Sequence, residues 1–533
     1  MFKPVLALFF VIIHLSIFQP AYAQDVVFDD IVKALPKASF RTLPATLDKA
    51  ATLDDERVAT LFARLLEGDV YFHPKNQQVM YASKIQGERV WIDTLTEQNI
   101  AQPSGVRLRK VRVNNRVRSH IRQLLAQRNL SHRDVTVRLQ ASQSLLADVD
   151  SISTKVISSR LEQEKNADII DVLTTITALK QLQNDDETAQ LGALETLRGS
   201  LYPEVRVALL SLQRNSEVTD TVKANVDAAL AGIEAKRKWF GWAETAFFGI
   251  SMGSVLLLAA IGLSITFGVM GVINMAHGEM IMLGAYTTYV IQQAFPNLIE
   301  YSLLMAVPAA FLVSGLMGVL IERSVIQFLK GRPLETLLAT FGISLILQQL
   351  VRTVFSPLNR QVASPEWMSG SWQINPVFSV TFNRLYIIIF SLAVFFSLLL
   401  FLKKSSLGLH VRAVAQNRDM ARALSVKSNW VDAATFGLGS GIAGVAGVVL
   451  SQLTNVGPNL GQAYIIDSFL VVVFGGVANL WGTLVSAMTL GVLNKFLEPV
   501  TGPVLATIIV LVGLVLFIQK RPMGLFPQKG RAE

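Results

Sequence analysis

Three polar side chains stand inside an apolar part of the sequence, where Asn274, His277 and Glu279 separate two hydrophobic runs. Ionisable groups at membrane depth are costly and are usually functional, because lipid offers them no hydrogen-bond partner. The glycines that would allow tight bends beside them are Gly268, Gly271 and Gly278. The pattern predicts a discontinuous helix whose polar groups face a protein-lined cavity. A wet turn between two spanning helices is the other interpretation, and the periodicity favours neither.

A second segment repeats this pattern. Gly476-Val477-Ala478-Asn479-Leu480 resembles Gly271-Val272-Ile273-Asn274-Met275, and both follow a Phe-Gly pair within a few residues. Corresponding broken segments in two halves of a chain are typical of transporters, whose substrate sites lie near such breaks. The residues that we expect to line a substrate pathway are Asn274, His277, Glu279, Thr340, Gly475, Gly476 and Asn479.

A basic segment between apolar runs, Lys403–Lys427, has helical periodicity. Val411, Val414, Ala415 and Ala421 form a small apolar stripe, which polar residues surround. A short amphipathic helix of this kind suits docking into a groove on a partner protein. A solvated loop helix that serves only membrane topology is the alternative interpretation.

The residues that the sequence lacks exclude several kinds of chemistry. The chain has no cysteine, and so no disulfide, thiolate-held metal or cysteine nucleophile. Since no glycine is followed by lysine, the phosphate-binding motif G-x-x-x-x-G-K-[ST] is absent. We therefore expect no ATP hydrolysis site, no catalytic residue and no cofactor on this chain. His277 and Glu279 have no further obvious ligands to join them, so no metal site is expected either.

The elements that must position these residues fall into three parts. Met1–Ala23 has a basic start, an apolar core and an Ala-x-Ala end, which is typical of a secretory signal peptide. Cleavage would involve Ala21, Ala23 and Gln24, and an uncleaved anchor helix is the alternative. Residues 24–238 hold most of the charge and contain no run long enough to span a bilayer. We expect this second part to be exported.

The second part shows irregular units in which a polar turn precedes amphipathic helices, a pattern typical of stacked HEAT-like repeats. Such turns are expected near Ser131–Asp134, Asn184–Asp186 and Asn215–Glu217. Tyr71–Thr94 instead alternates like a small β-hairpin. A basic cluster between Arg107 and Arg122 has no interleaved aromatic residue, which favours a solvated or partner-docking face over nucleic-acid binding.

The third part, residues 239–533, contains about eight or nine apolar runs, most of them near the ~20 residues that cross a bilayer. The composition of 51% hydrophobic and 16% charged residues, with a net charge of +9, therefore averages two different parts. Basic residues cluster at 323–332, 403–427 and 520–531. The positive-inside rule places these clusters and the C-terminus in the cytoplasm and the second part in the periplasm. The glycines that favour close helix packing are Gly437, Gly441, Gly444 and Gly447.

These patterns predict an all-α protein of the bacterial inner membrane, a polytopic helical domain after an exported HEAT-like domain. Four stretches in combination resemble the branched-chain amino acid ABC transporter permeases: GLSITFGVMGVINMAHGEMIMLGAY, GLHVRAVAQNRDMARAL, FGLGSGIAGVAGVV and FLVVVFGGVANLWGT. The resemblance covers Phe247–Pro527. It implies a membrane-embedded importer subunit that works with a second permease, cytoplasmic ATPase subunits and a periplasmic substrate-binding protein, without nucleic acid.

The resemblance also implies an ATPase-coupling loop within the basic segment. The loop residues that match are Gly408, Arg412, Ala413, Gln416, Asn417, Arg418 and Ala421. Ser425 departs from the family pattern, which usually carries glycine after Ala-Leu. We expect a slightly different bend there, without loss of coupling.

The long exported part resembles the urea-transporting branch of the family. Urea is neutral, with amide donors and one carbonyl acceptor, so asparagine and backbone carbonyls match it without a fixed charge. The first hypothesis is therefore a permease subunit for urea or a related amide, and the second is a branched-chain amino acid permease. A passive urea channel, which needs no ATPase, and a membrane hydrolase using His277 and Glu279 are the remaining alternatives.

Overall fold

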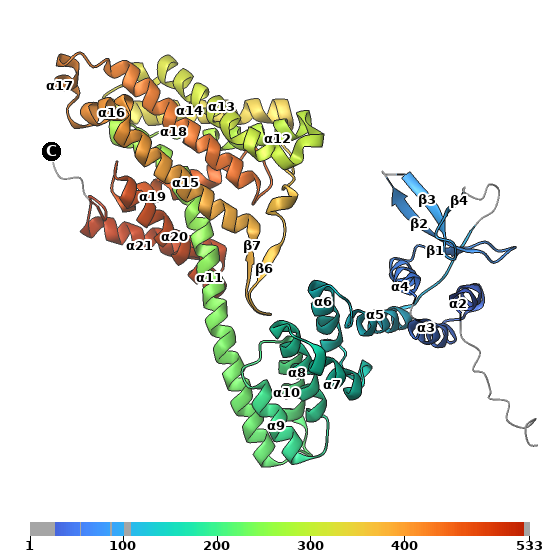
Figure 1. Ribbon diagram of the computed structural model, residues 1–533. Helices are drawn as coiled ribbons and strands as arrows, with labels where there is room; N and C mark the ends of the chain where they lie inside the picture. Colours follow the sequence, from blue (N-terminus) through green and yellow to red (C-terminus); the bar gives the residue numbers. More distant parts are fainter. Residues whose placement is uncertain (1–26, 54, 86–87, 101–107, 527–533) are drawn as a thin grey trace, which may run out of the picture. The chain divides into compact units, whose positions relative to one another are not determined.

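The computed structural model describes residues 27–53, 55–85, 88–100 and 108–526. The chain divides into two compact units, residues 1–233 and 234–533 (Figure 1). The expected signal peptide, with Ala21, Ala23 and Gln24 at its cleavage site, lies outside the described residues.

The first unit begins with helices and a small sheet. The helices are α2 (Phe28–Ala34), α3 (Leu43–Ala51) and α4 (Arg57–Glu67). The strands are β1 (Val70–Phe72), β2 (Val79–Ile85), β3 (Glu88–Asp93), β4 (Asn99–Ile100) and β5 (Arg109–Lys110), in the order β4-β3-β2-β1-β5. Strands β2 and β3 are antiparallel, with Met80 opposite Asp93. The hairpin predicted for this segment is therefore confirmed.

Six helices and the start of a seventh complete the first unit. They are α5 (Asn115–Asn129), α6 (Val135–Leu146), α7 (Thr154–Gln163), α8 (Ala167–Leu182), α9 (Glu187–Leu197), α10 (Pro203–Arg214) and α11 (Asp220–Met270). Neighbouring helices in the sequence pack on one another around a shared core, as in helical repeat arrays. Two predicted turns supply N-caps: Asp134 accepts from the Thr136 N–H at 2.8 Å and Asp186 from the Thr188 N–H at 3.0 Å.

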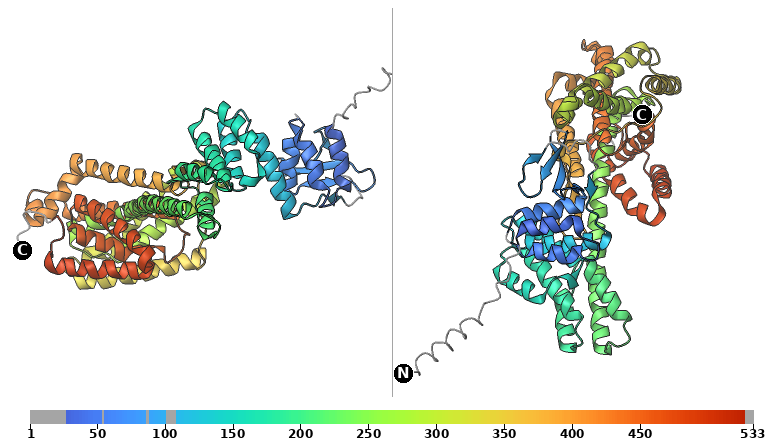
Figure 2. Two further views of the ribbon diagram at one scale, coloured as in Figure 1. Left: turned by 90° about the horizontal axis from the view of Figure 1, so that it is seen from below. Right: turned by 90° about the vertical axis from the view of Figure 1, so that its right-hand side faces the viewer.

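The second unit consists mainly of long apolar helices. They are α12 (His277–Ala294), α13 (Ser302–Ser324), α14 (Pro333–Phe355), α15 (Phe382–Lys404), α16 (Ser406–Gln416), α17 (Arg418–Ala423), α18 (Ser428–Ser451), α19 (Leu460–Gly475), α20 (Leu480–Thr501) and α21 (Pro503–Lys520). A short hairpin, β6 (Ser371–Gln373) and β7 (Ser379–Thr381), precedes α15. Two further views show that this unit consists almost entirely of helices (Figure 2).

Seven helices in the described part of the chain are long and apolar enough to cross a membrane. They are α11, α13, α14, α15, α18, α20 and α21. Two further apolar helices, α12 and α19, have 18 and 16 residues. The expected polytopic α-helical fold is confirmed.

Helix α18 is the centre of the second unit. In the most apolar 18-residue stretch of α18, 89% is buried inside the unit, whereas the corresponding value for α15 is 22%. Its glycines allow close approach: a Cβ on Gly447 would lie 1.9 Å from the Ile281 oxygen of α12, and one on Gly444 would lie 2.6 Å from the Ala310 oxygen of α13. The close packing predicted for these glycines is therefore confirmed, because no larger residue fits.

The tight bends expected at Gly268 and Gly278 are wrong. Both residues lie inside helices, α11 and α12, and only Gly271 of the three has a positive φ, +66°. Gly268 and Gly278 are required for packing instead. A Cβ on Gly268 would lie 2.2 Å from the Ala478 Cβ, and one on Gly278 would lie 2.7 Å from the Gly461 oxygen.

Candidate functional site

The predicted helix break lies between α11 and α12. Helix α11 ends at Met270, Gly271 turns the chain, and α12 starts at His277. The Asn274 side chain accepts a hydrogen bond from the Ala276 N–H at 3.0 Å. The Met275 N–H donates to the Thr340 hydroxyl of α14 at 3.1 Å. The break is thus a defined loop whose backbone groups are held by side chains, including the expected Thr340.

His277 and Glu279 lie within the helix packing rather than in a wet turn. Their exposed fractions are 0% and 1%, which excludes the wet turn that the sequence left open. His277 Nε2 lies 2.8 Å from the Ala259 carbonyl, so this nitrogen carries the proton. Glu279 Oε1 accepts from Ser344 at 2.8 Å and from Gln348 at 2.7 Å. The two side chains therefore fasten α12 to α11 and α14.

Ser344 and Gln348 of α14 were not predicted as partners of Glu279, although the sequence contains a signal for them. Thr336, Thr340, Ser344 and Gln348 recur every fourth residue in an otherwise apolar helix, and all four are buried. Residues at this spacing share one helix face. A polar face on a spanning helix must meet other polar groups, and here it meets the break and Glu279.

A pocket of about 290 Å³ lies beside the break. Its walls come from the end of α11, the break, α14 and α19. The lining residues are Leu263, Ile273, Asn274, Met275, Leu337, Ile465, Ile466 and Phe469. Asn274 is the one polar side chain in this lining. The pocket therefore offers an apolar wall with a single amide, and the buried His277 and Glu279 lie outside it.

The second predicted break, between α19 and α20, has the same local chemistry as the first. Gly476 has a φ of +100°, and Asn479 caps α20 by accepting from the Gly482 N–H at 3.1 Å. In both breaks the asparagine follows the left-handed glycine by three positions. Gly475 has no room for a Cβ, which would lie 2.5 Å from the Gly482 backbone.

The structure does not bring the two breaks into one pocket. Asn479 donates to the Phe526 carbonyl at 3.2 Å, and neither Gly475, Gly476 nor Asn479 lines the pocket beside Asn274. Near the second break, the Thr483 hydroxyl instead donates to Ser264 of α11 at 3.1 Å. The residues of α19 that do face the pocket lie one to three turns earlier.

One further sequence string has the spacing of a catalytic motif. Gly249-Ile250-Ser251-Met252-Gly253 matches G-x-S-x-G, whose nucleophile function needs a sharp strand-to-helix turn. Here the string lies within continuous helix α11, and Ser251 is fully buried. The glycines instead allow α20 to approach, since a Cβ on Gly249 would lie 2.6 Å from the Val492 Cα.

The basic segment after α15 folds into the two short helices α16 and α17. Val411, Val414 and Ala421 of the predicted stripe are buried, and Ala413 and Ala415 pack partly against the same core. Gly408 lets the chain turn back onto α15, since a Cβ there would lie 2.0 Å from the Leu402 oxygen. The expected amphipathic character is therefore confirmed.

The polar residues of the expected coupling loop divide into two groups. Arg412, Gln416 and Asn417 are exposed, and Asn417 caps α17 by accepting from the Met420 N–H at 3.0 Å. Arg412 also donates to the Leu402 carbonyl. Arg418, by contrast, pairs with the buried Asp432 of α18.

Three exposed apolar residues on this segment were missed. Leu409, Met420 and Leu424 are 59%, 64% and 79% exposed. A mixed face of exposed leucine, methionine, arginine and glutamine is typical of a protein-docking surface. The signal in the sequence is the presence of large apolar residues outside the buried stripe.

Ser425 occupies a position where glycine is favoured. Its φ is +66°, and the Ser425 N–H and Val426 N–H donate to the Arg422 and Ala421 carbonyls, closing the end of α17. This is a Schellman motif, in which the left-handed residue is usually glycine. The bend is thus the one that glycine would make, at a conformational cost of about 1 kcal/mol.

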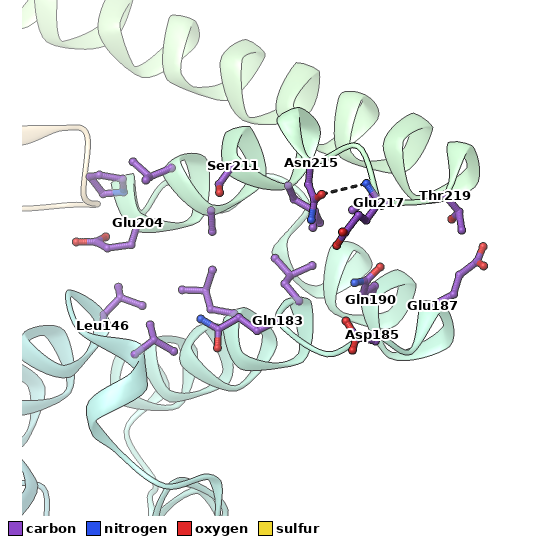
Figure 3. A pocket seen from close by; sticks show the side chains of 18 of the residues that line it. Leu146, Gln183, Asp185, Glu187, Gln190, Glu204, Ser211, Asn215, Glu217 and Thr219 are labelled. Carbon is purple, nitrogen blue, oxygen red and sulfur yellow. Dashed lines mark hydrogen bonds between the residues drawn. The ribbon is translucent and has the colours of Figure 1, made fainter.

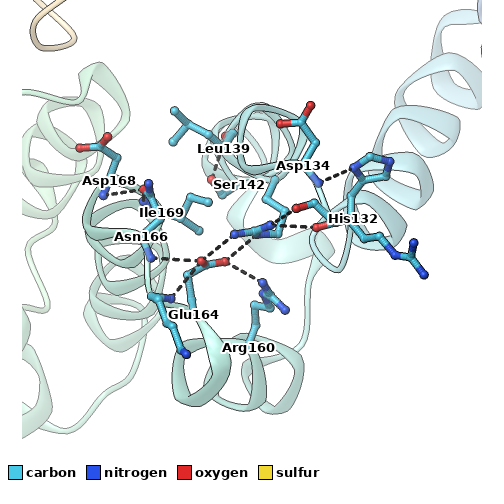
Figure 4. A network of polar contacts seen from close by, with 12 residues as sticks. His132, Asp134, Leu139, Ser142, Arg160, Glu164, Asn166, Asp168 and Ile169 are labelled. Atoms are coloured by element: carbon cyan, nitrogen blue, oxygen red, sulfur yellow. Dashed lines mark hydrogen bonds and ion pairs between the residues drawn. The ribbon is translucent and has the colours of Figure 1, made fainter.

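The first unit holds a larger pocket and a buried charge network. The pocket, about 1020 Å³, is lined mainly by α8, α10 and the turns beside them, with Asp185, Glu204 and Glu217 among its walls (Figure 3). In the network, Glu164 accepts from Arg138 at 2.9 and 3.0 Å and from Arg160 at 2.7 Å (Figure 4). These arginines, Arg138 above all, lower the pKa of Glu164 from the ordinary 4.5 to about 2.

Comparison with known proteins addresses the second unit. The family model described as branched-chain amino acid transport system / permease component matches residues 245–519. The permease protein BraD of a high-affinity branched-chain amino acid transport system from Pseudomonas aeruginosa is 30% identical over 296 residues, which are 54% of this chain and 94% of BraD. The corresponding LivH proteins of Salmonella typhimurium and Escherichia coli (strain K12) are each 29% identical over 297 residues, 54% of this chain and 95% of theirs. No solved structure matches the chain.

Proposed function

Because this chain belongs to the family of permease components of branched-chain amino acid transport systems, we propose that it is the membrane subunit of an ATP-binding cassette importer. Substrate would be delivered by a periplasmic binding protein and pass between this chain and a second permease. The single observation that carries the proposal is the match over nearly the whole length of the relatives.

We propose a branched-chain amino acid as the first candidate substrate. The relatives named above carry that substrate in their names. The pocket beside Asn274 supports the same choice, because an aliphatic side chain gains free energy on an apolar wall and urea does not. Asn274 and the backbone of the break would supply the polar contacts. The buried His277 and Glu279 would hold the helices that shape this wall.

Urea is the second candidate, favoured by one observation. The relatives are covered almost completely by 54% of this chain, so the first unit has no counterpart in those alignments. A long exported domain before the permease resembles the urea-transporting branch of the family. In this role Asn274 would match the amide groups of urea.

Uptake of radiolabelled substrate separates the two candidates. A strain lacking its own transporters would carry the chain with its partner subunits, and uptake of leucine and of urea would be measured with cross-competition. Saturable leucine uptake that excess urea does not inhibit would support the first candidate. Urea uptake without leucine uptake would support the second. Flux that persists without the ATPase subunits would contradict an importer and support a passive channel.

Energy would enter through α16 and α17, whose exposed residues include Arg412 and Gln416. We expect the double variant Arg412→Ala, Gln416→Ala to insert normally but to lose most substrate-stimulated ATP hydrolysis, because the docking face is truncated. Arg332→Ala, at an exposed arginine outside these helices, is the control. Normal stimulation in the double variant would remove this function from the segment.

The pocket has its own test. Asn274→Leu removes the one amide in the pocket lining and the acceptor of the Ala276 N–H, and we expect impaired uptake with normal assembly. Leu338→Met, a change of similar volume at an exposed leucine of α14 outside the pocket lining, is the control. Unchanged uptake kinetics in Asn274→Leu would contradict a pathway function for the pocket.

A further inference from the structure

A buried cluster of opposite charges lies where α17, α18 and the end of α13 meet. The carboxylates of Asp432 on α18 and Glu322 on α13 are both 0% exposed. The Lys330 ammonium lies between them, 2.8 Å from Asp432 Oδ2 and 3.2 Å from Glu322 Oε1. Arg418, the first residue of α17, completes the cluster at Asp432.

Arg418 holds Asp432 through both of its terminal nitrogens. Nη1 donates to Oδ2 at 2.6 Å and Nη2 donates to Oδ1 at 3.1 Å. A two-point arginine–carboxylate contact fixes orientation as well as distance. A second arginine, Arg422, donates from Nε to the Ser428 hydroxyl in the first turn of α18 at 2.8 Å. Helix α17 is therefore attached to α18 at two places.

Helix α18, to which α17 is attached, packs closely against helices α11 and α12 in the core of the unit. A Cβ on Gly439 would lie 2.6 Å from the Gly262 oxygen of α11, and one on Gly447 would overlap the Ile281 oxygen of α12. Helices α11 and α12 are the two that flank the Asn274 break. A contiguous path of contacts therefore leads from the proposed docking helices to the break.

Stability alone is a weak reason to keep such a cluster. The desolvation of buried charges often cancels their attraction, and apolar replacements of similar volume can be equally stable. Buried ionic groups are best explained where they fix one arrangement of elements among several. Here the elements fixed are a short surface helix and the most buried helix of the unit.

We propose that the Arg418–Asp432 pair, supported by Lys330 and Glu322, is a positioning device that makes α17 and α18 move as one body. It would pass the conformational change of the ATPase subunits to the helices on either side of the Asn274 break. This inference rests on the proposed importer function, since it requires an ATPase partner. It assigns a coupling role to Asp432, which lies outside the docking helices.

The test uses the complete transporter reconstituted in proteoliposomes. Arg418→Gln removes the link from α17 alone, and Asp432 remains paired with Lys330, so no buried charge is left without a partner. Arg332→Gln is the matched control, because Arg332 pairs with Glu335 where both side chains are more than half exposed. Substrate uptake and the stimulation of ATP hydrolysis by loaded binding protein are the readouts.

We expect both readouts to fall about tenfold in Arg418→Gln, with basal hydrolysis and co-purification of the ATPase subunits retained. Arg332→Gln should match the unaltered chain. The double variant Arg418→Gln, Asp432→Asn should lose no more than the worse single variant, because both changes break one link. A merely structural function for the pair would not spare basal hydrolysis while abolishing stimulation.

Three outcomes would overturn the inference. Stimulation in Arg418→Gln within about twofold of the unaltered chain would show that the link is not needed. Additive losses in the double variant, or loss of the ATPase subunits from Arg418→Gln, would assign Arg418 to direct docking. If the unaltered transporter itself shows neither uptake nor stimulation, the proposed function fails, which is distinct from normal coupling in the variants.

Discussion

Glu164 in the first unit and Asp432 in the second are both buried carboxylates held by two cations. Glu164 is paired with Arg138 and Arg160, whose side chains are 12% and 16% exposed. It also accepts from the N–H groups of Lys165 at 3.0 Å and Asn166 at 3.2 Å. Figure 4 shows Arg160 and Asn166 beside the Glu164 carboxylate.

The cations of Asp432 are placed differently. Arg418 and Lys330 are 28% and 23% exposed, and they come from a short surface helix and from the segment after α13. In the described part of the chain, the hydrogen bonds to the Asp432 carboxylate come from the Arg418 side chain and not from a backbone N–H. A buried carboxylate paired with two cations can therefore have two different structural functions. A carboxylate anchored by its own backbone stabilises one arrangement, whereas a carboxylate anchored by a separate helix can connect two elements.

The largest expected effect separates the two sites by stability. We expect Glu164→Gln to lower the free energy of unfolding of the first unit by about 3 kcal/mol, since two poorly exposed arginines lose their partner. Asp432→Asn should cost the second unit only about 1 kcal/mol, because Lys330 keeps Glu322 as its partner and the partly exposed Arg418 can reach solvent. Hydrogen exchange of the full chain in detergent, followed peptide by peptide, measures both.

Glu162→Gln, the same substitution at an exposed position beside Glu164, is the control and should leave exchange unchanged. Comparable opening of α18 in Asp432→Asn and of α8 in Glu164→Gln would abolish the distinction between the two sites.

The next effect depends on pH. Because the pKa of Glu164 is lowered to about 2 in the folded chain, its ionised form stabilises the first unit above the ordinary value of 4.5. That stabilisation is lost as the pH falls from about 4.5 to about 2. The difference in exchange between the unaltered chain and Glu164→Gln should therefore shrink across this window. A difference that stays constant would show that the carboxylate charge is not what holds α6, α7 and α8 together.

A smaller effect comes from replacing arginine by lysine at the two sites. Arg138 and Arg418 each make two contacts with their carboxylate, and lysine can make only one such point contact. Arg138→Lys should cost about 1 kcal/mol of stability without changing transport. Arg418→Lys should reduce stimulated ATP hydrolysis about threefold without changing exchange in α18. Equal behaviour of the two variants in both assays would contradict the comparison.

The smallest effect is expected at Ser425, which closes α17 in a left-handed conformation. Ser425→Gly should stabilise the end of α17 by up to about 1 kcal/mol, since glycine adopts this conformation without strain. Protection of the amides of α17 should rise slightly, and coupling should be unaffected. A loss of uptake would mean that the strained serine itself takes part in the function.

Much of the architecture could be predicted from the sequence because its signals are local. Asp134 and Asp186 cap helices where polar turns were expected, and the apolar stripe of Val411, Val414 and Ala421 is buried. The first helix break was predicted from Gly271 and Asn274, whose effects extend over only a few residues. Such signals act within one or two helical turns.

The rest depends on contacts between distant segments. Glu279 meets Ser344 and Gln348, and Asp432 meets Lys330, across separations that no periodicity encodes. Gly268 and Gly278 were misinterpreted for the same reason. A glycine needed for the approach of another helix and one needed for a bend are identical in the sequence.

The glycine contacts along α18 restrict how such a chain can diverge. Even a methyl group at Gly447 or Gly444 would separate helices that touch through their backbones. Larger residues at these positions would disrupt the helix packing. Under the proposed function, adaptation to a new substrate would proceed through the side chains around the pocket, such as Leu337 and Ile466, which are exposed enough to vary. Residues at the centre of the second unit therefore tolerate fewer substitutions than residues around the pocket.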